Sequence, residues 1–305
     1  MNRSRLTGLI AAVHTPFHSD GSLNIGAVSG QARRLASTGV RGVFVTGTTG
    51  EGQSLTLDER RAMAEAWAEH GAAERLDVIM QVGANCLADS RALAAHAEGL
   101  RVRAISAVAP SYHKPHTVAA LAECSLRIAE AAPVTPFYYY EIPAFTGLTI
   151  PTTAYLEAAL ERIPSFVGLK YSCPDLMQLQ EVLATGDGAL DVLFGVDEQL
   201  LAALALGVQG AIGATYNFAA PIFERILEAY AAGALEGARA LQLLTVRMVR
   251  IILRYGVVPA TKAIMQMIGM PVGPPRLPYA PMSPAELAEM ERDLRAIGFF
   301  EHIAR

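Results

Sequence analysis

Short apolar segments alternate with longer amphipathic segments along most of the chain. Eight short segments are apolar almost throughout, which is typical of strands buried on both faces of a parallel sheet. The expected strands are residues 9–13, 42–45, 78–82, 104–109, 136–142, 166–171, 192–194 and 210–214. The segments between them have helical spacing, and the expected helices are residues 25–36, 57–70, 88–100, 118–131, 153–162, 176–184, 198–206 and 221–231. Eight such units predict an α/β protein with a closed (β/α)8 TIM barrel.

Two local signals support this division. Thr56 precedes the second expected helix and Glu59 follows three residues later, which is the pattern of a capping box. After the first expected strand the chain lacks the glycine fingerprint of a dinucleotide-binding fold. A closed barrel is therefore favoured over an open doubly wound sheet.

The pattern changes to purely helical after the eighth unit. Helices are expected at residues 238–254, 261–268 and 284–297, and residues 270–278 form a proline-rich, rigid connector before the last of them. We expect residues 234–305 to be a helical extension packed on the barrel of residues 1–233. The two parts are predicted to form a single structural domain.

Composition narrows the class of partner. The chain has 305 residues, of which 52% are hydrophobic, so it can bury a large core. A net charge of −4 and an isoelectric point near 6.0 give no general attraction to nucleic acid or to an anionic membrane. No apolar run reaches the roughly 18 residues of a membrane-spanning helix. Three widely spaced cysteines argue against a disulfide framework, and we expect a cytoplasmic protein without nucleic-acid or membrane partners.

A lysine stands near the end of the sixth expected strand. Lys170 follows an apolar run, and Lys114 and Lys262 are the only other lysines of the chain. Burial disfavours the ammonium form of such a side chain and frees the amine as a nucleophile for Schiff-base chemistry on a carbonyl. The alternative is a strand-end lysine that extends to solvent. From this segment alone, both interpretations stay open.

Chemistry in a barrel of this type takes place at the carboxyl ends of the strands. The second strand is followed by Gly47-Thr-Thr-Gly-Glu-Gly52. Its backbone N–H groups and the hydroxyls of Thr48 and Thr49 can bind an anion such as a carboxylate. The alternative is a plain glycine-rich turn. The Lys and Ser/Thr of a phosphate-binding P-loop do not follow, so a nucleotide is not expected.

The fifth strand ends with three consecutive tyrosines. Strand alternation places Tyr138 and Tyr140 on one face and Tyr139 on the other. At an inward-facing strand end, Tyr140 can carry a proton. The alternative, aromatic packing, is favoured for at least one of the three.

Further polar groups follow the later strands. Ser172 comes after the sixth strand, and Asp197 and Glu198 come after the seventh, where their carboxylates can bind sugar hydroxyls. The alternative for Asp197 is a helix N-cap. Three histidines lie near strand ends without a matched set of ligands, so no metal site is expected and structural or surface roles are favoured for His14, His113 and His116.

The order of these motifs resembles a known family. Gly47-Thr-Thr-Gly-Glu51, Tyr140-Glu-Ile-Pro143, Gly168-Leu-Lys170 and Gly195-Val-Asp-Glu198 are similar to motifs of the pyruvate-dependent class I aldolases of the N-acetylneuraminate lyase and dihydrodipicolinate synthase family. The resemblance spans nearly the whole chain. Within the family, Tyr-Tyr-Tyr-x-Ile-Pro, Gly-Val-Asp-Glu-Gln and Gly-Pro-Pro-Arg-Leu-Pro are most similar to the animal-type lyase branch.

The resemblance implies a role for each matching residue. Lys170 matches the Schiff-base lysine and Tyr140 the catalytic tyrosine. Thr48 and Thr49 match the pair that binds the substrate carboxylate and helps to relay a proton, and Tyr112 matches a tyrosine lent to the neighbouring subunit's site. Positions that contact the sugar chain are matched by Ser172, Gly195, Asp197 and Glu198.

Three positions bear on specificity. Ala214 stands where the family has a serine that touches the substrate, and Val258 stands where relatives often carry an aromatic residue. Phe145 stands where the dihydrodipicolinate branch has an arginine that receives a carboxylate of its second substrate. An apolar side chain cannot make that bidentate contact, so that branch is disfavoured.

The resemblance implies a cytoplasmic, homotetrameric lyase that needs no metal or organic cofactor. It would cleave the small-molecule substrate N-acetylneuraminate reversibly to N-acetylmannosamine and pyruvate. Two alternatives stay open. One is a related class I aldolase or dehydratase acting on another 2-keto-3-deoxy sugar acid, and the other is a non-catalytic barrel that binds sialic acid.

Overall fold

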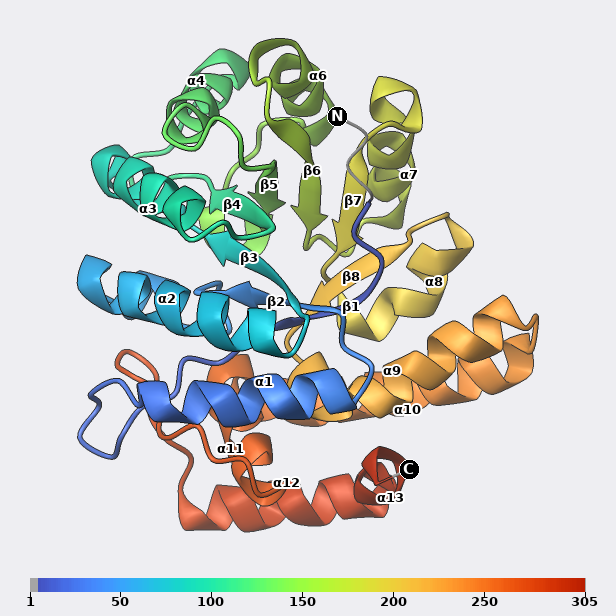
Figure 1. Cartoon of the computed structure of the whole chain (residues 1–305). Helices are drawn as coiled ribbons and strands as arrows, with labels where there is room; N and C mark the ends of the chain where they lie inside the picture. The colour runs from blue at the N-terminus through green and yellow to red at the C-terminus, as the bar shows by residue number, and fades with distance from the viewer. Residues whose placement is uncertain (1–4, 305) are drawn as a thin grey trace.

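Eight parallel strands close into a barrel. The computed structural model describes residues 5–304 of the chain. Each strand pairs with the next, and β8 pairs with β1, so the ring is complete (Figure 1). The strands are β1 Gly8–Ala12, β2 Gly42–Val45, β3 Asp77–Gln81, β4 Ala104–Val108, β5 Phe137–Glu141, β6 Phe166–Tyr171, β7 Asp191–Phe194 and β8 Gly210–Gly213. The predicted (β/α)8 barrel is confirmed.

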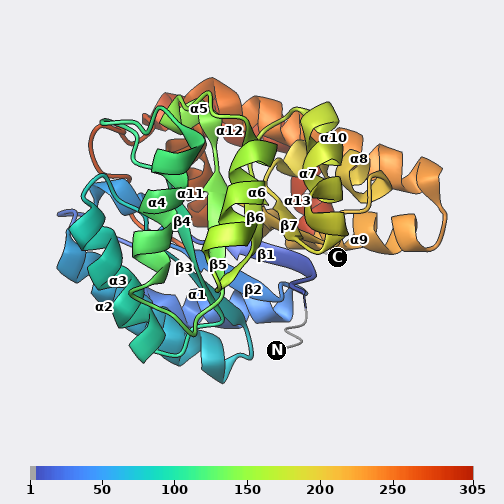
Figure 2. The same cartoon turned by 90° about the horizontal axis from the view of Figure 1, so that it is seen from above.

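Helices surround the strands on the outside (Figure 2). The longer helices of the eight β/α units are α1 Val28–Ser37, α2 Leu57–Ala73, α3 Leu87–Gly99, α4 Val118–Ala129, α6 Thr152–Arg162, α7 Leu176–Ala184 and α9 Tyr216–Ala231. Shorter elements are α5 Pro143–Thr146, α8 Leu200–Ala205 and the 3-10 turns η1 Ile25–Ala27, η2 Gly52–Ser54, η3 Thr185–Gly188 and η4 Asp197–Gln199. The capping box at the start of α2 is present, because the Thr56 hydroxyl accepts from the Glu59 N–H at 3.2 Å and Glu59 accepts from the Thr56 N–H at 2.9 Å.

Two helices start four or more residues before the predicted position. Helix α9 begins at Tyr216 rather than at residue 221, and Pro221 lies inside it. The preceding turn is retained because Tyr216, Phe218 and their neighbours are buried in the core, and tertiary packing outweighs the local proline signal. In the C-terminal part, the helix expected from residue 261 begins at Val257.

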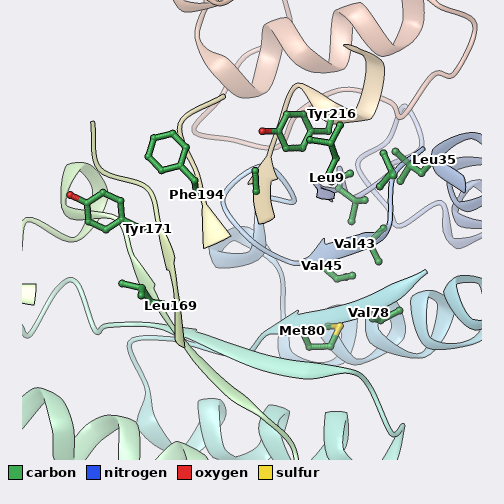
Figure 3. Close-up of a cluster of buried hydrophobic side chains, with 14 of the residues drawn as sticks. Leu9, Leu35, Val43, Val45, Val78, Met80, Leu169, Tyr171, Phe194 and Tyr216 are labelled. Carbon is green, nitrogen blue, oxygen red and sulfur yellow. The ribbon is translucent and has the colours of Figure 1, made fainter. Parts of the chain in front are cut away.

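Strand alternation separates two cores. Val43, Val45, Leu169 and Tyr171 point away from the barrel axis into the layer between strands and helices (Figure 3). Phe44 lies between the two valines and belongs to a second cluster inside the barrel. The period-2 pattern of each strand thus decides which side chains reach the interior.

The three tyrosines of β5 follow the same rule. Tyr138 and Tyr140 lie in the interior cluster, and Tyr139 lies in the outer one, as predicted. Tyr138 is nearer the amino end of β5, where its hydroxyl donates to Asp191 at 2.7 Å. The same carboxylate accepts from the backbone N–H of Leu6 at 2.8 Å. Tyr138 therefore belongs to the amino-terminal end of the barrel, and Tyr140 belongs to the opposite end.

The C-terminal helices pack against one side of the barrel. They are α10 Leu235–Tyr255, α11 Val257–Met267, α12 Pro284–Ala296 and α13 Phe299–Ile303. Helix α10 runs along α9, helices α11 and α12 pack against α10, and α13 packs against α9 (Figures 1 and 2). Within residues 5–304, none of the helices is both long and apolar enough to cross a membrane.

Candidate active site

Lys170 points into the barrel from the carboxyl end of β6. Its neighbours Leu169 and Tyr171 face the outer core, so alternation directs Lys170 inward (Figure 3). The residue is only 5% exposed. Its Nζ lies 4.2 Å from the centre of the Phe44 ring and 4.3 Å from the centre of the Tyr140 ring. Two aromatic faces thus shield the amine from water, and the alternative of a lysine extending to solvent is wrong.

Tyr140 stands beside Lys170 on the neighbouring strand. The two residues are register partners in the β5–β6 pair. The Tyr140 ring meets Phe44 edge to face with 5.3 Å between centroids, which fixes the plane of the phenol. Its hydroxyl is 3.2 Å from the hydroxyl of Thr48. A phenolic oxygen held next to a buried amine and joined to a second hydroxyl can pass a proton between substrate atoms.

The loop after β2 has a constrained backbone. Glu51 lies in the left-handed region with φ of 53°, and a side chain on Gly52 would overlap the carbonyl oxygen of Thr46. The hydroxyl of Thr15, after β1, donates to the Gly50 carbonyl at 2.6 Å. This close-packed loop holds Thr49, itself buried, next to Thr48 at the barrel mouth.

Asp197 is buried at the end of β7. Its Oδ2 accepts from the backbone N–H of Thr215 at 2.9 Å and from its hydroxyl at 2.6 Å, so it does not cap a helix. Burial raises the pKa of this carboxyl above its usual value, and its bonds to Thr215 and the nearby charge of Lys170 oppose the rise. A side chain on Gly213 would overlap the carboxylate. The structure therefore places Asp197 close to Lys170, with one oxygen already engaged by protein groups.

Four further predicted positions lie nearby. A side chain on Gly195 would overlap the hydroxyl of Ser172, so the glycine leaves room for it. Within residues 5–304 this buried hydroxyl bonds to no protein group, which suits a role in binding a ligand. Burial raises the pKa of Glu198. Ala214 directly follows β8, and its carbonyl accepts from the Asn217 amide at 2.8 Å.

Within one chain, the side chain of Tyr112 lies apart from the other predicted site residues. Its side chain is 82% exposed, which is unusual for a tyrosine so close to a site. Asn85 holds the loop, because its Oδ1 accepts from the backbone N–H groups of Ser111 at 2.9 Å and Tyr112 at 3.0 Å. The phenol is therefore presented outward on an ordered loop.

A cavity of about 180 Å³ opens beside Thr48 and Tyr140. Its other walls include Asn85, Ser111 and Phe145, whose ring is 62% exposed. The cavity thus lies between the glycine-rich loop, the loop of Tyr112 and the segment after β5. Tyr140, whose ring lies beside the Lys170 amine, lines this cavity.

The described part of the chain contains no cluster of side chains that could hold a metal ion. Across residues 5–304, His, Cys, Asp and Glu side chains do not gather in threes as a metal ion would need. His14 is buried, and its Nε2 lies 2.9 Å from the Thr261 hydroxyl of α11. Burial, and secondly the charge of Lys262, lowers the pKa of His14 to about 3, so the imidazole is neutral. His113 and His116 are exposed.

Two residues near the site, Phe44 and Glu51, were not assigned a role from the sequence. Phe44 forms one wall of the Lys170 amine, and the alternation of β2 was a sufficient signal for its inward position. Glu51 of the glycine-rich loop pairs with Lys262 of α11 at 2.6 Å. No local pattern links these two residues, because they come from distant parts of the chain.

Comparisons with known proteins agree with this geometry. The profile of the Dihydrodipicolinate synthetase family matches residues 5–297. The N-acetylneuraminate lyase of Gallus gallus is 40% identical over 299 residues, which are 97% of each chain. The solved N-acetylneuraminate lyase of Proteus mirabilis has a TM-score of 0.94 and 38% identity, covering 97% of this chain and 100% of that one. The enzyme of Aliivibrio salmonicida has a TM-score of 0.94 and 39% identity, covering 98% and 99%.

Proposed function

This chain belongs to the dihydrodipicolinate synthetase family, and from its similarity to N-acetylneuraminate lyases we propose that it is one of them. It would cleave N-acetylneuraminate reversibly to N-acetylmannosamine and pyruvate as a class I aldolase. The observation that carries the proposal is the amine of Lys170, held between the rings of Phe44 and Tyr140 at the carboxyl end of the barrel. Such a site suits a lysine that acts as a nucleophile.

The first step is attack of the Lys170 amine, after loss of its proton, on the C2 ketone of the open-chain sugar acid. Loss of water from the carbinolamine gives an iminium ion, which can accept the electron pair of the bond to be broken. Thr48 and Thr49 bind the substrate carboxylate, and the N–H groups of their loop add donors. The buried loop restrains these donors before the substrate arrives, which favours the reactive geometry.

Tyr140 moves the proton in the second step. Its phenolic oxygen takes the proton of the C4 hydroxyl and passes its own proton through the Thr48 hydroxyl to the substrate carboxylate. At the same time the C3–C4 bond breaks, and the electron pair of that bond passes to the iminium and gives an enamine. N-acetylmannosamine leaves as the aldehyde. Protonation at C3 and hydrolysis of the regenerated iminium release pyruvate and free Lys170. The 3.2 Å contact between the Tyr140 and Thr48 hydroxyls supports a relay towards the carboxylate side.

The sugar chain would lie towards β7 and β8. We propose that Ser172, Gly195, Asp197 and Glu198 line this part, and the unengaged hydroxyl of Ser172 supports the assignment. Because one Asp197 oxygen is engaged by Thr215, only the other is free for a sugar hydroxyl. The apolar side chain of Phe145 supports the assignment of a substrate that lacks the second carboxylate bound in the dihydrodipicolinate branch.

Restoring a hydroxyl at position 214 tests the substrate. If N-acetylneuraminate is the substrate, Ala214→Ser should be neutral or raise kcat/KM by roughly two- to tenfold, since one hydrogen bond contributes about 0.5–1.5 kcal/mol net. The measurement is coupled pyruvate release from N-acetylneuraminate and from a panel of other 2-keto-3-deoxy sugar acids, with both proteins.

The opposite pattern would reject the substrate assignment. In that case the wild-type protein cleaves N-acetylneuraminate negligibly and Ala214→Ser rescues it, while activity on another sugar acid falls. The result would favour the second candidate, a related aldolase or dehydratase with an apolar requirement at this point. A barrel that only binds sialic acid would release no pyruvate from any member of the panel.

We also propose that the chain works as a homotetramer in the cytoplasm and as one structural domain. The exposed phenol of Tyr112 on an ordered loop supports a role in a neighbouring subunit's site. Buried contacts between the barrel and α11 support a single folding unit of residues 1–233 and 234–305. Sedimentation equilibrium is expected to give the mass of four chains, and a single-chain mass would contradict the assembly.

A further inference from the structure

A fully buried ion pair joins the glycine-rich loop to the C-terminal extension. Lys262 Nζ of α11 lies 2.6 Å from Oε1 of Glu51, and the two side chains are 2% and 0% exposed. Charges removed from water in this way carry a large desolvation cost, and such a pair is often no more stabilising than apolar residues of similar volume. Its presence therefore calls for an explanation beyond stability.

The ammonium group of Lys262 is surrounded by oxygens. Besides the Glu51 carboxylate, it donates to the carbonyl of Thr15 at 3.1 Å and to that of Pro274 at 3.0 Å. The Phe17 ring covers it, with 4.3 Å between Nζ and the ring centre. These partners hold the group in one place. Burial lowers the pKa of Lys262, and the Glu51 charge opposes this effect.

Two partners of Lys262, Glu51 and Thr15, belong or bond to the glycine-rich loop. The Oε2 of Glu51 accepts from the backbone N–H of Arg276 at 2.7 Å, and the Glu51 N–H donates to the Thr48 carbonyl at 3.0 Å. Thr15, whose carbonyl binds Lys262, donates through its hydroxyl to Gly50 at 2.6 Å. The loop that carries Thr48 is thus clamped from the β1 side and from α11 at the same time.

We infer that Glu51 and Lys262 are positioning residues, which fix the loop of Thr48 and Thr49 in the shape that binds the substrate carboxylate. The inference rests on the proposed function, since it concerns the same loop. Neither residue touches the reacting atoms. A shift of the loop weakens the contact with a carboxylate, whereas the Lys170 amine, on a different strand, keeps its surroundings.

The test is Glu51→Gln, which keeps the shape of the side chain and removes its charge. With cyanoborohydride, the rate of adduct formation is measured for pyruvate and for its neutral analogue pyruvamide. We expect the pyruvate rate at low concentration to fall by about tenfold to a hundredfold, the range for a misplaced positioning group, while the pyruvamide rate changes by less than about threefold. A variant that was only less stable would lose both rates together.

Glu59→Gln is the matched control. Glu59 binds the same connector through Arg276, at 2.7 Å and 2.5 Å, but it lies in α2 and not in the loop. We expect it to lower the thermal midpoint without changing the ratio of the pyruvate and pyruvamide rates. An equal change of that ratio in both variants, or no change in a folded Glu51→Gln protein, would overturn the inference.

A second variant keeps the test informative if Glu51→Gln alone does not fold. The double change Glu51→Gln with Lys262→Met leaves no lone buried charge, and the same fall in the pyruvate rate is expected. If both variants are unfolded by circular dichroism, the pair is needed for folding itself and the positioning role is rejected. Failure of the proposed function is recognised separately, because the wild-type protein would then form no adduct or release no pyruvate from N-acetylneuraminate.

Discussion

Borohydride added together with pyruvate is expected to inactivate this protein and to leave one reduced adduct per chain, on Lys170. Hydride adds to the iminium carbon and converts it to a stable secondary amine, so the nucleophile is permanently blocked. Lys170 is the expected site because its amine faces two aromatic rings at the barrel mouth. Lys262 is not expected to compete, because oxygens surround its ammonium group.

The matching variant is Lys170→Met, which keeps an unbranched apolar stem against Phe44 and Tyr140. We expect kcat to fall by on the order of 10⁴ or more, since the covalent route is lost. Peptide mass mapping and pyruvate release give the two measurements. Lys114→Met, at an exposed position, serves as the control and should keep both the adduct and the activity. An adduct on Lys114 or Lys262, or none, would refute the role of Lys170.

Tyr140→Phe is expected to lower kcat by roughly 10²–10⁴, the range for a group that transfers protons, and to leave the fold intact. The ring keeps its contact with Phe44 and with the Lys170 amine, so only the hydroxyl and its 3.2 Å contact with Thr48 are lost. Steady-state pyruvate release and thermal unfolding measure the two effects. A change of kcat within about threefold would make Tyr140 a packing residue.

Tyr138→Phe provides a control on the same strand. Its hydroxyl also points into the barrel, but it donates to the buried Asp191 at the amino-terminal end. Removing it leaves a buried carboxylate with one donor fewer, so we expect a loss of about 1–3 kcal/mol in the free energy of unfolding. The chemical step should be unaffected. Loss of the Tyr138 hydroxyl is thus expected to lower the stability of the fold, whereas loss of the Tyr140 hydroxyl is expected to lower kcat. The two hydroxyls differ in their position along the same strand.

The inward-facing half of the site could be predicted because strands have a fixed period. The placement of Lys170, and of Tyr140 on the same side as Tyr138, follows from alternation and from the rule that barrel chemistry takes place at carboxyl strand ends. The capping box at Thr56 is equally local. Phe44 could have been found by the same argument applied to β2.

Contacts between distant segments could not be predicted in this way. The pairing of Glu51 with Lys262 depends on how α11 packs on the loops after β1 and β2, and neither residue differs locally from a surface charge. The start of α9 at Tyr216 is also a tertiary effect, because burial retains a helical turn that Pro221 alone would argue against. Sequence periodicity gives the faces of elements, whereas their mutual docking sets these details.

The link between α11 and the glycine-rich loop limits how this protein can be recombined with its relatives. A barrel taken from one relative and an extension taken from another join at residues 233 and 234, where the chain looks divisible. Such a junction separates Glu51 from the lysine that neutralises it and Thr15 from the same ammonium group. A chimera therefore needs the loops after β1 and β2 and helix α11 from the same parent protein, although these segments are far apart in the sequence.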